Sequence, residues 1–173
     1  YDIIANTAQR IEVPEELSIG GGLINITLNG NLWFKSREGV QEYNPISGQV
    51  TLYQVDIPQN SYLTIKDIVN RDGILWFVSN LGLGKIDLQT KQSEIIGNPS
   101  NIKFPQWGLE HLALAENEIW TDASDNPGDG LYVYNLDQKT WRHITQQNSD
   151  LQFDWVRRMV KGGDYLIMPS FGR

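Results

Sequence analysis

Short runs of apolar and polar residues, separated by turn-forming residues, recur along the whole chain of 173 residues. Three runs share a phrase with Trp as its fourth residue: GNLWF at 30–34, GILWF at 73–77 and NEIWT at 117–121. These tryptophans are 43 and 44 residues apart, and a fourth phrase, GDYLI at 163–167, has Leu166 in the Trp position. A fixed period of this length is typical of an architecture built from repeated units.

Each unit contains four short segments that are rich in strand-forming residues. Val, Ile, Tyr, Trp and Thr favour strands, whereas the Gly, Asn, Asp and Pro residues between the segments favour turns. The Gly that opens the third segment predicts a turn or a close approach of two backbones. No long amphipathic helical pattern is present. The first segments are 23–26, 65–68, 109–112 and 156–159, the Trp phrases form the second, and the fourth are 49–53, 92–96 and 141–145.

Four strands in each unit of about 43 residues predict an all-β fold, namely a β-propeller of four-stranded blades. A single twisted sheet cannot bury both of its faces, whereas sheets stacked around an axis shield one another. The Trp of the second strand is large and apolar enough to fill the wedge between two blades. The predicted blades are 18–60, 61–104 and 105–150, with a split blade formed by 151–173 and 1–17.

Two arrangements agree with the phase of the repeats. Tyr1-Asp2 matches Tyr43-Asn44, and 10–13 is typical of an outermost strand, so the chain starts in the middle of a blade and stops after a second strand. This gives about four repeats, as three whole blades and two half blades. Either the N-terminal strands complete the C-terminal blade and close a ring of four, or the chain is a fragment of a larger propeller with further blades.

Composition excludes several classes of partner. The formal net charge is −7, and an acidic chain gains nothing from releasing the counterions of DNA or RNA, so no nucleic acid is expected. No apolar run approaches the length of about 18 residues that a membrane helix needs, so no membrane insertion is expected. The chain has no cysteine, which excludes disulfides and thiolate chemistry. No leader segment is recognisable at its start.

The repeated phrases resemble those of the bacterial two-component regulator propellers. Their pattern is roughly V-x-x-I, then D-x-x-G-x-L-W-F-G-T, then G-L-x-x-Y-D-x-x-T-G-x-W-x-x-Y. The resemblance covers nearly the whole chain, although other residues stand in the place of the usual Gly-Thr. The matching segments are 65–68, DGILWF at 72–77, GVQEYNPISG at 39–48, GLYVYN at 130–135 and Trp141. The positions that depart from the pattern are KS at 35–36, VS at 78–79, DA at 122–123 and Leu166.

This resemblance implies a sensor domain for signal transduction that binds a ligand or a protein, lies in the periplasm or outside the cell, and often precedes a signalling module. Related propellers occur in lyases and in secretion and surface assemblies. We therefore expect a non-enzymatic binding propeller. The alternatives are a propeller lyase that acts with a divalent metal and a structural scaffold within a surface or secretion assembly.

The candidate ligand-binding residues lie on or just before the first strands, which line the central channel of a propeller. Exposed aromatic residues at the channel mouth could stack on a sugar ring or anchor a protein, and arginines could hold a carboxylate, although packing between blades would explain the aromatics equally. Asn25, Asp67, His111 and Arg158 occupy equivalent positions of a predicted polar column. The full candidate set is Tyr62, Trp107, His111, Trp155, Arg157 and Arg158.

Catalytic and metal-binding patterns are sparse. His143 is expected to be a solvated edge residue, whereas His111 next to Glu110 could act as a base with its orienting carboxylate. A lyase would need further metal ligands that the pattern does not identify, so we predict no catalytic residue and no cofactor. Clustered acidic residues in the loop after Trp120 could hold Ca²⁺, but their spacing does not match an EF-hand. The acidic residues of this loop are Asp122, Asp125 and Asp129, and Asn126 lies among them.

Overall fold

The computed structural model describes residues 12–15, 17, 23–26, 30–97, 108–122, 130–152, 159–162 and 165–168. In this part of the chain, strands form three four-stranded antiparallel sheets and one two-stranded sheet, each in simple sequential order. Within the same part, no helix is long and apolar enough to span a bilayer.

The strands follow the repeats, one sheet to each repeat. Sheet 1 comprises β1 (Leu23–Ile26), β2 (Leu32–Lys35), β3 (Gly39–Tyr43) and β4 (Val50–Gln54). Sheet 2 comprises β5 (Ile65–Arg71), β6 (Ile74–Ser79), β7 (Gly82–Asp87) and β8 (Ser93–Ile95). Sheet 3 comprises β9 (Leu112–Leu114), β10 (Glu118–Asp122), β11 (Leu131–Asn135) and β12 (Thr140–Ile144). Sheet 4 comprises β13 (Val160–Gly162) and β14 (Tyr165–Ile167).

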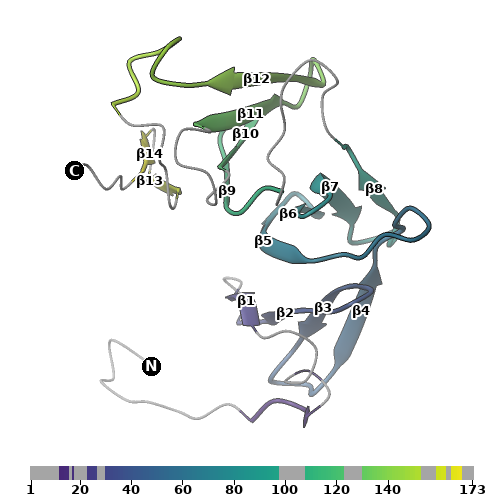
Figure 1. The fold of residues 1–173 in the computed structure, drawn as a ribbon. Helices are drawn as coiled ribbons and strands as arrows, with labels where there is room; N and C mark the ends of the chain where they lie inside the picture. The colour runs from purple at the N-terminus through teal and green to yellow at the C-terminus, as the bar shows by residue number, and fades with distance from the viewer. Residues whose placement is uncertain are drawn as a thin grey trace, which may run out of the picture.

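The sheets succeed one another around a common inner side. The first strand of each sheet, which we call the inner strand, contacts the next: β1 lies against β5, β5 against β9, and β9 against β13. Figure 1 shows β4, β8 and β12 on the outside of this arc. The radial stacking of sheets confirms the propeller architecture predicted from the repeats.

Sheets 1 and 2 pack face to face with Trp33 between them. The Trp33 side chain is only 1% exposed, and its ring centroid lies 5.6 Å from that of Tyr53. Its indole Nε1 is buried and forms no hydrogen bond within the described part of the chain. Trp33 therefore occupies the predicted wedge, in a core formed with Val40, Tyr53, Val55, Leu63, Ile65, Ile68, Leu75, Phe77 and Ile86.

The two later tryptophans face the following sheet in the same way. Trp76 packs against the core between sheets 2 and 3, which contains Tyr132 and Tyr134 of β11. Trp120 packs against the core that Met159 shares with sheet 3. Both are half-buried, which leaves Trp33 as the most enclosed of the three.

An Asn or Asp residue starts the turn between the third and fourth strands of each four-stranded sheet. Its side-chain oxygen accepts hydrogen bonds from two backbone N–H groups of the turn. The N–H four residues later donates to its carbonyl at 2.8–3.0 Å, and that later residue has a φ between 54° and 73°. The pairs are Asn44 with Gly48, Asp87 with Lys91, and Asn135 with Lys139.

Glycine opens the third strand where the fourth strand lies close to it. A Cβ on Gly39 would overlap the backbone oxygen of Tyr53, and a Cβ on Gly130 would overlap that of Ile144. The expected close approach of two backbones is confirmed at these two positions.

Sheet 4 has the predicted hairpin, but the side chains of β14 face the opposite way to those of the second strands of the earlier sheets. Leu166, in the Trp position, packs back toward sheet 3, whereas Tyr165 and Ile167 are 77% and 57% exposed. Val160 pairs with Ile167, although its partner by alignment with sheet 2 is Leu166. A slip of one residue in register turns every side chain of a strand to the other face.

The inner strands also depart from their predicted bounds. Segment 23–26 is β1, and 65–68 lies within β5, but β9 begins only at Leu112 and β13 only after Met159. Glu12 and Val13, the described part of the expected outermost strand at 10–13, lie outside any strand. The bounds predicted for the four blades stay a prediction.

Candidate ligand-binding site

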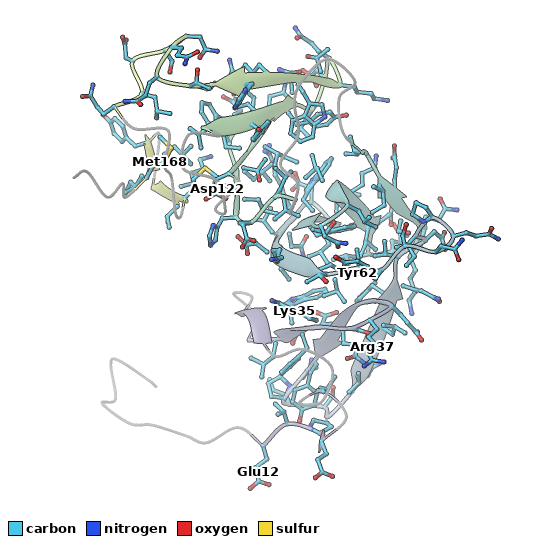
Figure 2. The ribbon with its side chains drawn as sticks, in the orientation of Figure 1. Glu12, Lys35, Arg37, Tyr62, Asp122 and Met168 are labelled. Carbon is cyan, nitrogen blue, oxygen red and sulfur yellow. The ribbon has the colours of Figure 1, made fainter. Side chains whose placement is uncertain are left out.

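Two of the six candidate ligand-binding residues lie in the described part of the chain. Tyr62, just before β5, is 69% exposed, and its backbone carbonyl accepts a hydrogen bond from Asn80 Nδ2 at 2.9 Å. His111, just before β9, is half-buried. Figure 2 shows Tyr62 well apart from Asp122, the partner of His111, so the structure does not bring the two candidates together. Outside the described residues lie Trp107, Trp155, Arg157 and Arg158.

His111 is fixed by Asp122, the last residue of β10. Its ring Nδ1 lies 3.1 Å from Asp122 Oδ2 and 3.2 Å from Oδ1, and its backbone N–H donates to Oδ1 at 2.8 Å. Asp122 is 0% exposed, whereas the His111 side chain is 31% exposed. A buried carboxylate therefore holds both the backbone and the ring of a partly exposed histidine.

The contacts of Asp122 explain why β9 starts late. The N–H of Glu110 donates to the Asp122 carbonyl at 3.0 Å, so the amides of residues 110 and 111 are both turned toward Asp122. Regular pairing with β10 starts at Leu112. In sheet 2, β5 has its own irregularity between Ile65 and Asp67. Such bulges change the direction of side chains and are frequent next to functional sites.

Asp67 connects the inner strands of sheets 2 and 3. Its Oδ1 accepts the N–H of Ile68 at 2.8 Å, and its Oδ2 accepts the N–H of Leu112 at 3.1 Å across the sheet junction. Two members of the predicted polar column, Asp67 on β5 and His111 just before β9, therefore lie at this junction, and the column as a whole stays a prediction.

Glu110 does not orient His111, contrary to the pairing expected from sequence. Its carboxylate instead binds Lys66 Nζ at 2.8 Å, across the junction to β5. The side chains of Lys66 and Glu110 are 28% and 18% exposed, which leaves the ion pair partly open to solvent. Asp122 takes the orienting role because the late start of β9 places the His111 ring over the end of β10.

Burial and neighbouring charge change the proton affinity of two groups in this site. The hydrogen bond with Asp122 raises the pKa of His111, against the lowering effect of burial, and the charges of Asp67 and Glu110 add to the rise. Burial raises the pKa of the Asp67 carboxyl, while its two backbone hydrogen bonds lower it. Both groups therefore bind a proton more readily in the folded chain than in the unfolded chain.

We call Lys66, Asp67, Glu110, His111 and Asp122 the inner-strand cluster. Its carboxylates are engaged by backbone N–H groups, by His111 and by Lys66. The groups left to meet a ligand are hydrogen-bond donors or a titratable ring nitrogen: the remaining N–H groups of Lys66 and the Nε2 atom of His111. The arrangement is suited to binding an acceptor group of a ligand.

The described residues contain no group of three or more His, Cys, Asp or Glu side chains that could hold a metal ion. Asp122, one member of the loop considered for Ca²⁺, is bound to His111. Asp125, Asn126 and Asp129 lie outside the described residues, so a Ca²⁺ site in this loop stays a prediction.

The other histidine, His143, lies on β12, the edge strand of sheet 3, as the sequence predicts, but it is half-buried. Its ring stacks on Tyr132, with a centroid distance of 4.4 Å and an interplanar angle of 10°. The two residues are directly opposite each other on β11 and β12, which brings their rings together on one face of sheet 3.

Sequence reasoning missed the roles of Lys66 and Asp122 in the cluster. A signal for Asp122 was present, because DA at 122–123 stands where the resembling repeats have Gly-Thr. An acidic residue in the place of a small one at a strand end indicates a local partner. The partner itself could not be inferred, since it depends on the late start of β9.

A second concave region lies on the outer half of sheet 3. This hollow of about 280 Å³ contains the ion pair of Arg142 and Glu118, with Nη2 and Oε2 2.7 Å apart, and the Arg142 guanidinium lies 5.3 Å from the Trp120 ring centroid. On sheet 2, Trp76 of the corresponding row packs against sheet 3, whereas the side chains of Lys85 and Glu94 are 39% and 59% exposed. We therefore interpret the hollow as a surface that a following sheet would cover only in part.

Solved structures share this architecture, although no family model and no curated protein matches the chain. The extracellular domain of BT4673 from B. thetaiotaomicron, described both as a one-component and as a hybrid two-component system, matches with a TM-score of 0.63 and 18% identity. The match covers 92% of this chain and 20% of that one. The chain is built of β-propeller sheets.

Two further matches agree with this assignment. The extracellular domain of the hybrid two-component system BT3049 from the same organism has a TM-score of 0.61 at 16% identity, over 83% of this chain and 19% of that one. The computationally designed Ika4 protein has a TM-score of 0.60 at 14% identity, over 94% and 92% of the two chains. The chain thus spans about one fifth of the extracellular domains that it matches, and its fold resembles two-component sensor domains as the sequence pattern indicates.

Proposed function

We propose that this chain is part of a periplasmic or extracellular sensor propeller that binds a small molecule, a glycan or a protein at the inner-strand cluster. The observation that carries the proposal is His111, a partly exposed ring fixed between two sheets by a fully buried carboxylate. Burying an acidic side chain costs free energy, and here the buried carboxylate holds one polar side chain in a defined place. The likeness to extracellular domains of one- and two-component systems supports the location and the sensing role.

Binding fits the cluster better than catalysis does. The carboxylates of Asp67 and Glu110, which a reaction would need as free bases, are engaged by backbone amides and by Lys66. Groups held this firmly favour recognition of a complementary ligand, because little ordering remains to be done when the ligand binds.

The test is isothermal titration calorimetry of the whole chain against neutral, uronate-bearing and amine-bearing disaccharides and short neutral, acidic and basic peptides. At least one compound is expected to bind, and His111→Gln is expected to weaken that binding at least tenfold. Gln89→Ala, on an exposed turn of sheet 2, is the matched control and should leave affinity unchanged. Binding that survives His111→Gln would place the ligand elsewhere.

Further propeller sheets are proposed as a second kind of partner. The chain spans a fifth of the matching extracellular domains, and Trp76, the equivalent of Trp120 in sheet 2, packs against a neighbouring four-stranded sheet, whereas the described part of sheet 4 beside Trp120 has two strands. Mass measurement by multi-angle light scattering of the purified chain tests this. A well-folded monomer without exposed apolar surface would contradict it.

A lyase is the second candidate, because His111 and Asp122 have the arrangement of a base with its orienting carboxylate. It predicts turnover of a polysaccharide that requires a divalent metal and disappears in His111→Ala. Turnover that is unaffected by chelator, or no turnover with any metal, would remove this candidate.

A further inference from the structure

The His111 ring is held in one orientation. Nδ1 faces both oxygens of Asp122, so the Nδ1 proton stays between the ring and the carboxylate whether the ring is neutral or charged. Nε2 forms no hydrogen bond with the described residues, and the side chain is 31% exposed. Nε2 is thus an acceptor in the neutral ring and a donor in the charged ring, at a fixed place.

When the ring is protonated, the charges around it cancel except for that of Asp67. Asp122 of β10 faces Nδ1 and neutralises the imidazolium. Glu110, which precedes His111 in the chain, is neutralised by Lys66 of β5. Asp67 of β5 is the remaining charge, and its two oxygens accept backbone N–H groups.

Within the ligand-binding role proposed above, we propose that the inner-strand cluster binds an uncharged ligand through an oxygen acceptor, which receives a hydrogen bond from protonated His111 Nε2, and that binding takes up a proton. The proton comes from solvent and goes to Nε2. No bond in the ligand forms or breaks.

The charge of the ligand follows from the same contacts. A cation is disfavoured because Asp122, Asp67 and Glu110 each already bind a donor, Glu110 through its Oε1 atom. An anion would approach Asp67 and Asp122 without a cation left uncompensated to attract it. A hydroxyl or amide oxygen needs only a donor, and His111 and Lys66 supply donors.

The hydrogen bond with Asp122 raises the pKa of His111 above its ordinary value, which favours the charged ring. A ligand that accepts a hydrogen bond from the charged ring binds that form better, and it raises the midpoint further by linkage. Affinity is therefore expected to increase as the pH falls through the midpoint of His111.

The first experiment needs no ligand. Long-range ¹H–¹⁵N spectra of the labelled whole chain, recorded above the titration midpoint, report which nitrogen of the neutral ring carries the proton. His111 is expected to be protonated at Nδ1, and His143, which is stacked on Tyr132, serves as the internal comparison. A neutral His111 protonated at Nε2 would overturn the inference.

The second experiment repeats the calorimetry, for each compound that binds in the panel, in phosphate and in Tris at the same pH. Because the two buffers release a proton with different enthalpies, the difference in measured heat gives the protons bound. Uncharged compounds are expected to dominate, with uptake of up to about one proton per ligand that is lost in His111→Gln. Hits without proton uptake would sink this inference but leave the binding function intact; a panel without hits removes both.

Discussion

His111 is the residue that links the charge of the molecule to its folding. Its pKa is raised above the ordinary value of 6.5 in the folded chain, chiefly by the hydrogen bond with Asp122. A group whose folded pKa is raised stabilises the fold fully below the unfolded pKa, and this contribution is lost as the pH rises through the folded pKa. Asp67, whose pKa is also raised, acts in the same direction at more acidic pH.

We therefore expect the unfolding free energy of the chain to fall as the pH rises from the unfolded pKa of His111 through its raised folded pKa, and this slope to flatten in His111→Gln. The measurement is urea unfolding at half-unit pH steps, followed by tryptophan fluorescence. Gln89→Ala, on an exposed turn, is the control and should keep the slope. An unchanged slope in His111→Gln would show that His111 and Asp122 do not interact in solution.

Lys139 has an unfavourable backbone conformation for a residue with a side chain. Its φ is 54°, at the turn position where sheet 1 has Gly48 with a φ of 73°. The left-handed conformation costs a non-glycine residue roughly 1–2 kcal/mol, of which the greater freedom of glycine in the unfolded chain cancels about half. Lys139→Gly is expected to stabilise the chain by about 0.5–1 kcal/mol in urea unfolding, and Lys139→Ala, which keeps the Cβ, should bring no gain.

The sequence predicts single residues well where their role is local. Asn44 was recognisable as a turn residue because its side chain caps its own backbone. The pairing of His111 with Asp122 could not be predicted, because it joins the segment just before β9 to the end of β10 outside the regular strand pairing.

Glycine at the start of the third strand sets how closely the third and fourth strands approach. Gly130 has a φ of 67°, and a Cβ there would overlap the Ile144 oxygen; Gly97 has a φ of 75° and open space around it. Replacing either by Ala costs roughly 1–2 kcal/mol for the backbone conformation. Gly130→Ala is expected to cost about 1–3 kcal/mol more than Gly97→Ala because of the overlap.

Urea midpoints of these two variants measure the difference directly. Equal losses would mean that β12 can move away from β11 without penalty, and that the glycine serves only the conformation of the turn.

Whole strands were predictable because alternation, turn residues and the period agree in each repeat. The register of sheet 4 was not, since Leu166 is as apolar as the Tyr165 and Ile167 that flank it. With apolar residues on both sides of the strand, pattern alone cannot determine which face is buried, and Leu166 packs toward sheet 3.

Across the whole molecule, stability comes from the junctions between sheets. Trp33 is 1% exposed between two complete sheets, whereas Trp120 is half-buried beside a two-stranded one. Trp33→Ala is expected to cost about 3–5 kcal/mol, the range for a buried aromatic residue. Trp120→Ala should cost clearly less, and Trp33→Phe less than Trp33→Ala, because Phe also removes the unpaired indole N–H.

Chemical unfolding of the three variants tests this order. A loss in Trp120→Ala as large as that in Trp33→Ala would mean that the outer half of sheet 3 is covered by further structure in solution. The repeats thus predicted the sheets and their stacking, but the number of sheets in the complete assembly depends on contacts that a repeat pattern does not encode.

In the described part of the chain, inner strands of successive sheets contact one another: β1 with β5, β5 with β9, and β9 with β13. Every junction is accordingly formed by contacts between two adjacent sheets. Duplication or loss of one unit would therefore leave the contacts at the remaining junctions unchanged. A propeller of this kind can change its number of blades in evolution when the DNA of a single unit is duplicated. A histidine at one junction would keep the same neighbours in the smaller ring and in the larger one.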